Sequence, residues 1–445
     1  MLSVIALASI AVSSPVNDEL ADMNRLSMSS HQDDSDDMMP EVRKSFRGRK
    51  FRNPASESVS EKRLESPIQV TLDCKVNNSK LCDKAVSATI DAGKRIAKIL
   101  HFYEPIKIKV TVYNFTNLTT GEDSRVAKHK AKLALAKSTD ETEWTRYRPA
   151  LLKQLPLNKQ PKWPEFDSEI TFNARFKFWS KNDGRPIKKR EYDIELVAAH
   201  EMTHGLGFAS LFGQHELGDF QLLLPAMWQL NETRTTLVVS HPTAYDRLLF
   251  DPLRGTNLVD IVKPIYNLKL DASDVSPAAL NRDPVYQRVA QISSYLLGVS
   301  RKKIGIRLST REMDEHFRIS HIDPSLFSND LISRLNARQI DFNKSLSMQV
   351  ALQEENVAFA HVVQEFKKGT SISHFQKDYE LTPNFLMTGD ACLNRGSSLD
   401  DTIWLNSLDG QIKTFGVYGY ELAKIMTDIG WPSVIDPTRK RMIVL

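Results

Sequence analysis

The motif His200-Glu201-Met202-Thr203-His204 constrains this chain more than any other feature of its sequence. It stands late in an apolar stretch, 192–208, whose spacing predicts a helix. Residues four apart lie on one face of adjacent helical turns, so both imidazoles would reach one zinc ion and Glu201 would reach a water beside it. The motif predicts His200 and His204 as ligands and Glu201 as the general base. Gly207 would permit the left-handed turn that ends the helix.

A catalytic zinc site ordinarily takes three protein ligands, so a third must come from elsewhere in the chain. The short metzincin pattern places a histidine ten residues after the first one, but that position here is Ser210. The residues alone leave several candidates open, namely His215, Glu216, Glu232, His241, His361 and His374.

Residues 200–208, HEMTHGLGF, resemble the start of the zinc signature of leishmanolysin-like metallopeptidases, a branch of the metzincins with a long insertion before the third histidine. Residues 369–374, GTSISH, and 384–388, NFLMT, are similar to the downstream half of that signature. A comparable pattern occurs in secreted HExxHxxGF proteins, many of them fungal and uncharacterised. The resemblance implies His374 as the third ligand and Met387 as the Met-turn residue beneath the metal. It also touches residues 168–178 and 420–431.

The apolar patterns outside the motif predict an α+β fold. Residues 68–72 and 106–112 alternate like strands, and 84–100 between them has helical spacing. The resemblance implies a metzincin-like protease with a twisted mixed sheet and the active-site helix in an N-terminal catalytic subdomain, 64–212. An irregular, helical C-terminal subdomain, 213–445, would hold the insertion, the third ligand and the Met-turn. Residues 255–350 match no pattern and suggest an inserted helical lobe or loops.

Residues 168–179 give the clearest strand signal, with apolar and polar side chains alternating. The resemblance implies that this strand lies above the cleft and pairs with an extended peptide or protein substrate. Thr171, Asn173 and Arg175 would then stand on the face near the substrate.

The N-terminal residues predict secretion into the extracellular space. The apolar run 2–12 is too short to span a bilayer of ~30 Å as a helix, but it fits a signal peptide over 1–14. Residues 15–63 are poor in aromatic and β-branched side chains and read as a disordered prosegment or leader. The dibasic pair Lys62-Arg63 ends that leader. No later run approaches 18 apolar residues, so no membrane span is expected.

Cysteines, sequons and charge add further expectations. Cys74 and Cys82 are eight residues apart and could form a disulfide, although Cys392 could pair with one of them instead. A net charge of +4 is too small to argue for nucleic acid as a partner. Five sequons would carry glycans in a secreted chain, at Asn77, Asn114, Asn117, Asn231 and Asn343.

Together these features predict a secreted zinc metalloendopeptidase. Three neutral histidines would leave Zn²⁺ its full charge, and Glu201 would move a proton from water to the leaving amine. One alternative is a catalytically inactive zinc-binding or wall-associated protein, and another is a zinc hydrolase that acts on a non-peptide amide. The intact Glu201 and the alternating strand favour the endopeptidase.

Overall fold

The computed structural model describes residues 64, 66–115, 125–138, 142–217, 220–231, 234–271, 283–309, 357–360, 370–389, 396–407, 414–437 and 443–445. The expected signal peptide, 1–14, and leader, 15–63, lie outside these residues, as do Cys392, Glu232 and His361. Within them the chain is a mixture of helices and several small sheets, in agreement with the expected α+β class.

A four-stranded mixed sheet forms the N-terminal part of the molecule. Its order is β1 (Ile68–Cys74), β2 (Ile106–Tyr113), β6 (Ser168–Asn173) and β3 (Ala127–Lys130). The first three strands are parallel, and β3 runs antiparallel to β6 at the edge. Both sides of β6 are therefore occupied by neighbouring strands.

Helix α2 (Ser79–Ile96) connects β1 to β2, as the expected β-α-β opening requires. Asn78 caps its N-terminus by accepting a hydrogen bond from the Leu81 amide at 3.1 Å. The predicted disulfide between Cys74 and Cys82 is present and ties the end of β1 to the first turns of α2. Helix α4 (Ile194–Leu206) packs against α2, β3 and β6.

The expectation of one long strand over 168–179 is wrong. The strand ends at Asn173, and a turn leads to β7 (Phe178–Trp179), which pairs with β8 (Tyr192–Asp193). The Asn173 side chain is fully buried and binds loop backbone: it accepts from the amides of Phe115 and Arg175, both at 3.2 Å, and donates to the Arg125 carbonyl at 3.0 Å. It therefore stabilises the turn and does not face a substrate.

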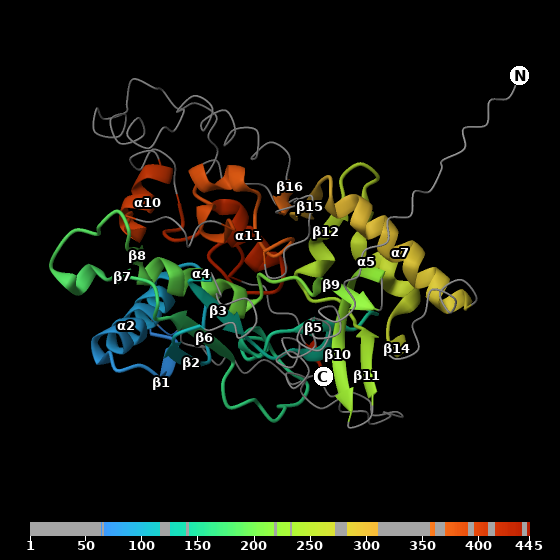
Figure 1. The fold of residues 1–445 in the computed structure, drawn as a ribbon, viewed down its shortest axis with the longest axis horizontal. Coiled ribbons are helices and arrows are strands. Elements are labelled where there is room, and N and C mark those ends of the chain that lie inside the picture. The colour runs from blue at the N-terminus through green and yellow to red at the C-terminus, as the bar shows by residue number, and fades with distance from the viewer. Residues whose placement is uncertain are drawn as a thin grey trace, which may run out of the picture.

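A second region lies at the other end of the molecule (Figure 1). Its antiparallel sheet contains β14 (Lys269–Asp271), β11 (Arg234–Val239), β10 (Phe220–Asn231) and β9 (Phe212–Leu217), in that order. Helix α7 (Pro284–Ser300) packs on β10, and the Leu223 amide donates to Ser293 Oγ at 2.9 Å. Asp283 caps α7 by accepting from the Val285 amide at 2.8 Å.

Another antiparallel sheet leads towards the residues near His374. Its order is β13 (Thr256–Asn257), β12 (Leu249–Asp251), β15 (Ile304–Arg307) and β16 (Val357–Ala360), and α5 (Leu258–Val262) follows β13. Ala360 of β16 forms an antiparallel bridge with Phe375. The described parts of 255–350 thus contain strands as well as helices, which the sequence pattern did not indicate.

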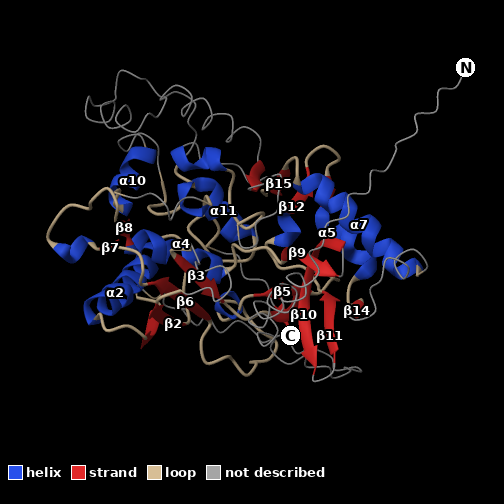
Figure 2. Cartoon of the chain, in the orientation of Figure 1, coloured by secondary structure: helices blue, strands red, loops and turns tan. Residues whose placement is uncertain are grey.

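The C-terminal residues return to the N-terminal sheet and its helices (Figure 2). The C-terminal helices are α10 (Leu399–Asn406) and α11 (Tyr420–Asp428). The last strand, β17 (Ile443–Val444), joins β4 (Ala134–Ser138) and β5 (Thr145–Tyr147) in a small sheet. The short helix α3 (Pro149–Leu152) follows β5 in the chain. Trp431 is fully buried, and its indole N–H donates to the Leu206 carbonyl at 2.9 Å. One continuous core therefore joins early and late parts of the chain.

Short 3-10 turns complete the described elements: η1 (Lys181–Asp183), η2 (Asp246–Leu248), η3 (Lys263–Ile265), η6 (Lys377–Leu381) and η7 (Phe385–Met387). Among the helices described, none has the length and apolar character needed to cross a membrane.

Two helical glycines give a matched test of how closely α2 approaches the sheet. A Cβ at Gly93 would overlap Ile68 Cγ1 and lie 3.2 Å from Ile68 Cβ, whereas a Cβ at Gly298 of α7 would meet nothing within 4 Å. Gly93→Ala should destabilise the fold by about 1 to 2 kcal/mol through overpacking. Gly298→Ala should stabilise it by up to about 1 kcal/mol through helix propensity. Urea unfolding measures both; equal effects would contradict the close α2–β1 packing.

Candidate metal centre

Helix α4 has well-defined ends. Asp193 caps its N-terminus by accepting from the amides of Glu195 at 2.8 Å and Leu196 at 3.4 Å, and it also accepts from the Leu399 amide of α10 at 2.7 Å. The helix ends at Gly207, which adopts the expected positive φ, 129°. A Cβ at Gly207 would lie 2.9 Å from Ile429 Cδ1, so this end of α4 also lies close to the segment after α11.

Three buried imidazoles meet on one face of α4. His200 Nε2 lies 3.1 Å from His374 Nε2, and His204 Nε2 lies 3.2 Å from the same atom. The three ligand atoms all lie within 4.8 Å of one another. The structure thus brings His374 to the helical pair across a separation of 170 residues from His204.

Each imidazole is oriented by a backbone carbonyl on its other nitrogen. The Nδ1 atoms of His200, His204 and His374 lie 2.6, 2.7 and 2.9 Å from the carbonyl oxygens of Leu386, Phe208 and Thr370, respectively. A carbonyl can only accept, so each Nδ1 carries the ring proton and each Nε2 presents a lone pair.

The spacing of these lone pairs fits a zinc ion. Lone pairs that face one another at 3.1 to 3.2 Å repel unless a cation lies between them. Two nitrogens bound to tetrahedral zinc at ~2.0–2.1 Å would be separated by roughly 3.3 Å, close to the observed spacing. Burial lowers the pKa of His200 and lowers that of His204 further, so both rings are neutral at neutral pH, as metal ligation requires.

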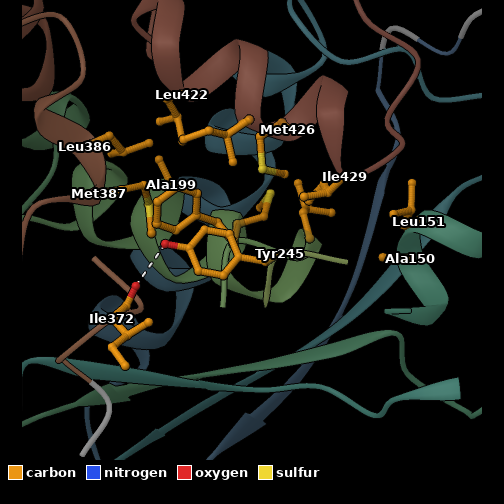
Figure 3. Close-up of a cluster of buried hydrophobic side chains, with 14 of the residues drawn as sticks. Ala150, Leu151, Ala199, Tyr245, Ile372, Leu386, Met387, Leu422, Met426 and Ile429 are labelled. Atoms are coloured by element: carbon orange, nitrogen blue, oxygen red, sulfur yellow. Dashed lines mark hydrogen bonds between the residues drawn. The ribbon is translucent and has the colours of Figure 1, made fainter. Parts of the chain in front are cut away.

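The segment around His374 is fixed on both sides of this histidine. The Phe375 amide donates to the Met387 carbonyl at 2.8 Å, and the Gln376 amide donates to the Phe359 carbonyl of β16 at 3.1 Å. On the other side, the Tyr245 hydroxyl donates to the Ile372 carbonyl at 2.9 Å (Figure 3). Ile372 itself has a φ of 71°, a strained conformation for a β-branched residue. This loop is therefore held in place by its surroundings.

Ser210, where the short metzincin pattern would place the third ligand, contacts the loop that carries His374. Its amide donates to Ser373 Oγ at 3.1 Å, and its hydroxyl donates to Asp246 Oδ1 at 2.6 Å. The buried Asp246 also accepts from the amides of Leu211 and Thr243, at 3.1 and 2.9 Å. This network joins the residues after α4 to those before His374.

The 3-10 turn η7 packs against α4 beside His200. Its Leu386 carbonyl is the acceptor for His200 Nδ1, and Met387 is fully buried beside Ala199 (Figure 3). The preceding Asn384 donates to the Glu421 carboxylate and accepts from the Leu422 amide at 3.0 Å. Helix α11 therefore supports the turn that orients His200.

Glu201 is buried next to the histidines. His129 of β3 faces it, with Nδ1 3.5 Å from Glu201 Oε2. The His129 ring also stacks on His204, with centroids 4.7 Å apart and planes inclined by 22°. Sequence reasoning missed His129 because the lysine-rich segment around it, AKHKAK, carries no motif.

The other candidate ligands that the structure describes, His215, Glu216 and His241, take no part in this group. Among the described residues, His200, His204 and His374 form the one set of three or more metal-binding side chains that lie close together. His215 and Glu216 are on β9, and the His241 ring packs near Tyr266 with centroids 5.1 Å apart.

The Asp193 cap of α4 should make the free energy of unfolding depend on pH. Burial raises the pKa of Asp193 from 3.8 to about 6, so the folded state binds this proton more tightly than the unfolded chain does. Protonated Asp193 therefore stabilises the fold fully below pH ~4, and this stabilisation is lost as pH rises through about 6. Asp193→Asn keeps a capping side chain but cannot ionise. Between pH 7 and 4, the wild type should gain about 2 kcal/mol over this variant in urea unfolding; a constant difference would contradict the prediction.

Comparison with known proteins gives a family. The family model described as SPBPB7E8-like matches residues 28–251, half of the chain, including β3 and α4 but not His374. "Uncharacterized protein PB7E8.01" of Schizosaccharomyces pombe is 27% identical over 202 residues, which cover 40% of this chain and 35% of that protein. The chain thus matches about a third of this relative's length. No solved structure matches it. Since the family model covers half of its residues, the chain belongs to the SPBPB7E8-like family.

Proposed function

We propose that the chain is a zinc-dependent endopeptidase of metzincin-like architecture, with His200, His204 and His374 as zinc ligands. The observation that carries this proposal is the meeting of three Nε2 lone pairs in a buried site, each ring held by a carbonyl on its Nδ1. Glu201 beside these rings supplies the carboxylate that peptide hydrolysis needs.

In the proposed mechanism the three histidines bind the metal and Glu201 transfers the proton. When bound, zinc supplies a Lewis acid that polarises a carbonyl and makes water more acidic. His200, His204 and His374 would hold the ion through their Nε2 lone pairs. The Glu201 carboxylate takes a proton from the attacking water and passes it to the leaving amine. The burial of these side chains limits access of bulk water to the reaction.

The edge strand β3 is the better candidate for pairing with an extended substrate. The expectation that 168–178 would do so is wrong, because β6 has β2 on one side and β3 on the other. β3 ends its sheet among the described strands, packs on α4 and places His129 beside Glu201. A peptide added to this edge would lie next to the metal-binding residues.

Several further features belong to the proposal. The subdomains are 64–212 and 213–445, with Met387 as the Met-turn residue, and the family resemblance suggested both. We also propose that the protein is secreted and that its leader is removed near Lys62-Arg63. The disulfide between Cys74 and Cys82 supports passage through an oxidising compartment.

Glu201→Gln tests the catalytic role separately from the metal site. The variant should keep one zinc per chain, because Glu201 is not a ligand, and should lose at least about 100-fold in casein hydrolysis because no general base remains. Metal analysis and a casein assay on the same samples, with and without a chelator, measure both properties. Zinc binding without hydrolysis in the wild type would favour the alternative of an inactive zinc-binding protein.

His374→Ala tests the third ligand, with His241→Ala as the matched control. The first variant should lose most of its zinc and its hydrolytic activity, because two imidazoles make a weak site. The second should retain both, because the His241 ring lies beside Tyr266 and outside the histidine group. Full zinc content in purified His374→Ala would show that another residue completes the site.

A further inference from the structure

His129 lies beside the candidate metal centre. It belongs to the edge strand β3, whereas Glu201 belongs to helix α4. It is the third residue of β3, where it pairs with Ile170 of β6. Its side chain is about three-quarters buried, with 23% exposed. β3 packs against α4, so the strand and the helix bring His129 and Glu201 together across 72 residues of sequence.

Two contacts fix the position of the His129 ring. One face stacks on His204 at 4.7 Å, and His204 is itself held by the Phe208 carbonyl. In this orientation the Nδ1 of His129 faces Glu201 Oε2 at 3.5 Å. Among the described residues, no other side chain lies within hydrogen-bonding or ion-pair distance of the Glu201 carboxylate.

His129 does not join the metal ligands. Its ring nitrogens are not among the ligand atoms that lie within 4.8 Å of one another. Its contact is instead with the carboxylate that the proposed mechanism uses as a base. A distance of 3.5 Å is long for a hydrogen bond, but catalytic hydrogen bonds are often long before substrate binds and shorten afterwards.

We propose that His129 is a positioning residue for Glu201. This inference rests on the proposed function. The imidazole donates its Nδ1–H to Oε2, which fixes the plane of the carboxylate and leaves Oε1 to take a proton from water. Without that donor the buried carboxylate can rotate away from the attacking water. The rate of hydrolysis falls while substrate binding along β3 is retained.

Two substitutions separate the hydrogen bond from the ring packing. His129→Leu keeps an apolar side chain on His204 but removes the donor, whereas His129→Asn loses the ring but places an amide N–H near the position of Nδ1. Zinc-loaded full-length protein is assayed for zinc content, kcat and KM on one peptide. His129→Leu should lower kcat about 10- to 100-fold with KM within about twofold, and His129→Asn should restore most of kcat.

His241→Ala is the matched control for the loss of an imidazole. The His241 ring packs near Tyr266, outside the histidine group and outside β3, so this variant should keep kcat and zinc. A purely structural role for His129 would give the reverse order, with His129→Asn worse than His129→Leu, or a loss of zinc in both. Either result would overturn the inference.

A measurement that needs no hydrolysis distinguishes failure of this inference from failure of the proposed function. Nitrogen-15 NMR of the imidazoles in the zinc-loaded wild type should show a proton on His129 Nδ1, and the Nδ1 resonance should shift in Glu201→Ala. If the wild type is inactive but these signals appear, the contact stands and the proposed function fails. A His129 Nδ1 without a proton would overturn the inference whatever the activity.

Discussion

The repulsion between three imidazole lone pairs is the constraint on which the rest of this structure depends. His374 Nε2 lies 3.1 Å from His200 Nε2 and 3.2 Å from His204 Nε2, in a site that excludes most solvent. The rings stay there because backbone carbonyls from three segments fix their Nδ1 atoms. These segments are the end of α4, the loop before His374 and the turn η7. The positions of these three segments therefore determine where the three imidazoles lie.

The C-terminal half of the chain supports these segments from one side. Helix α11 binds the turn through the Asn384 side chain, and Trp431 donates to the last carbonyl of α4 at Leu206. The Phe375 amide donates to the Met387 carbonyl, so the residue after His374 contacts the turn that orients His200. These contacts therefore support the segments whose carbonyls hold the histidines.

The long segment between Ser210 and Ser373 leaves the geometry of the three histidines intact because its two ends meet. Ser210 and Ser373 are 163 residues apart in sequence but joined by a hydrogen bond of 3.1 Å. The entropy of closing a loop grows only slowly with its length, so a large insertion costs little once its ends are fixed. Asp246 and Tyr245, which lie within this segment, add further hydrogen bonds at this junction. The sheet of β9, β10, β11 and β14 can then vary together with α7 without displacing His374, whereas β16 supports the residues that follow His374.

The sequence by itself determined the features that depend on local spacing. The helical pair His200 and His204 and the β-α-β opening follow from residues close together in the chain. The spacing of Cys74 and Cys82 allowed a disulfide but left Cys392 as an alternative partner, and the structure shows that Cys74 and Cys82 pair. A family resemblance, and not spacing, singled out His374 among six candidates. Only the tertiary structure placed its ring against the other two, put β3 at the edge where 168–178 was expected, and brought His129 to Glu201. The pairs His129–Glu201, His204–His374 and His200–His374 are 72, 170 and 174 positions apart, and such long-range contacts leave no periodic signal in the sequence.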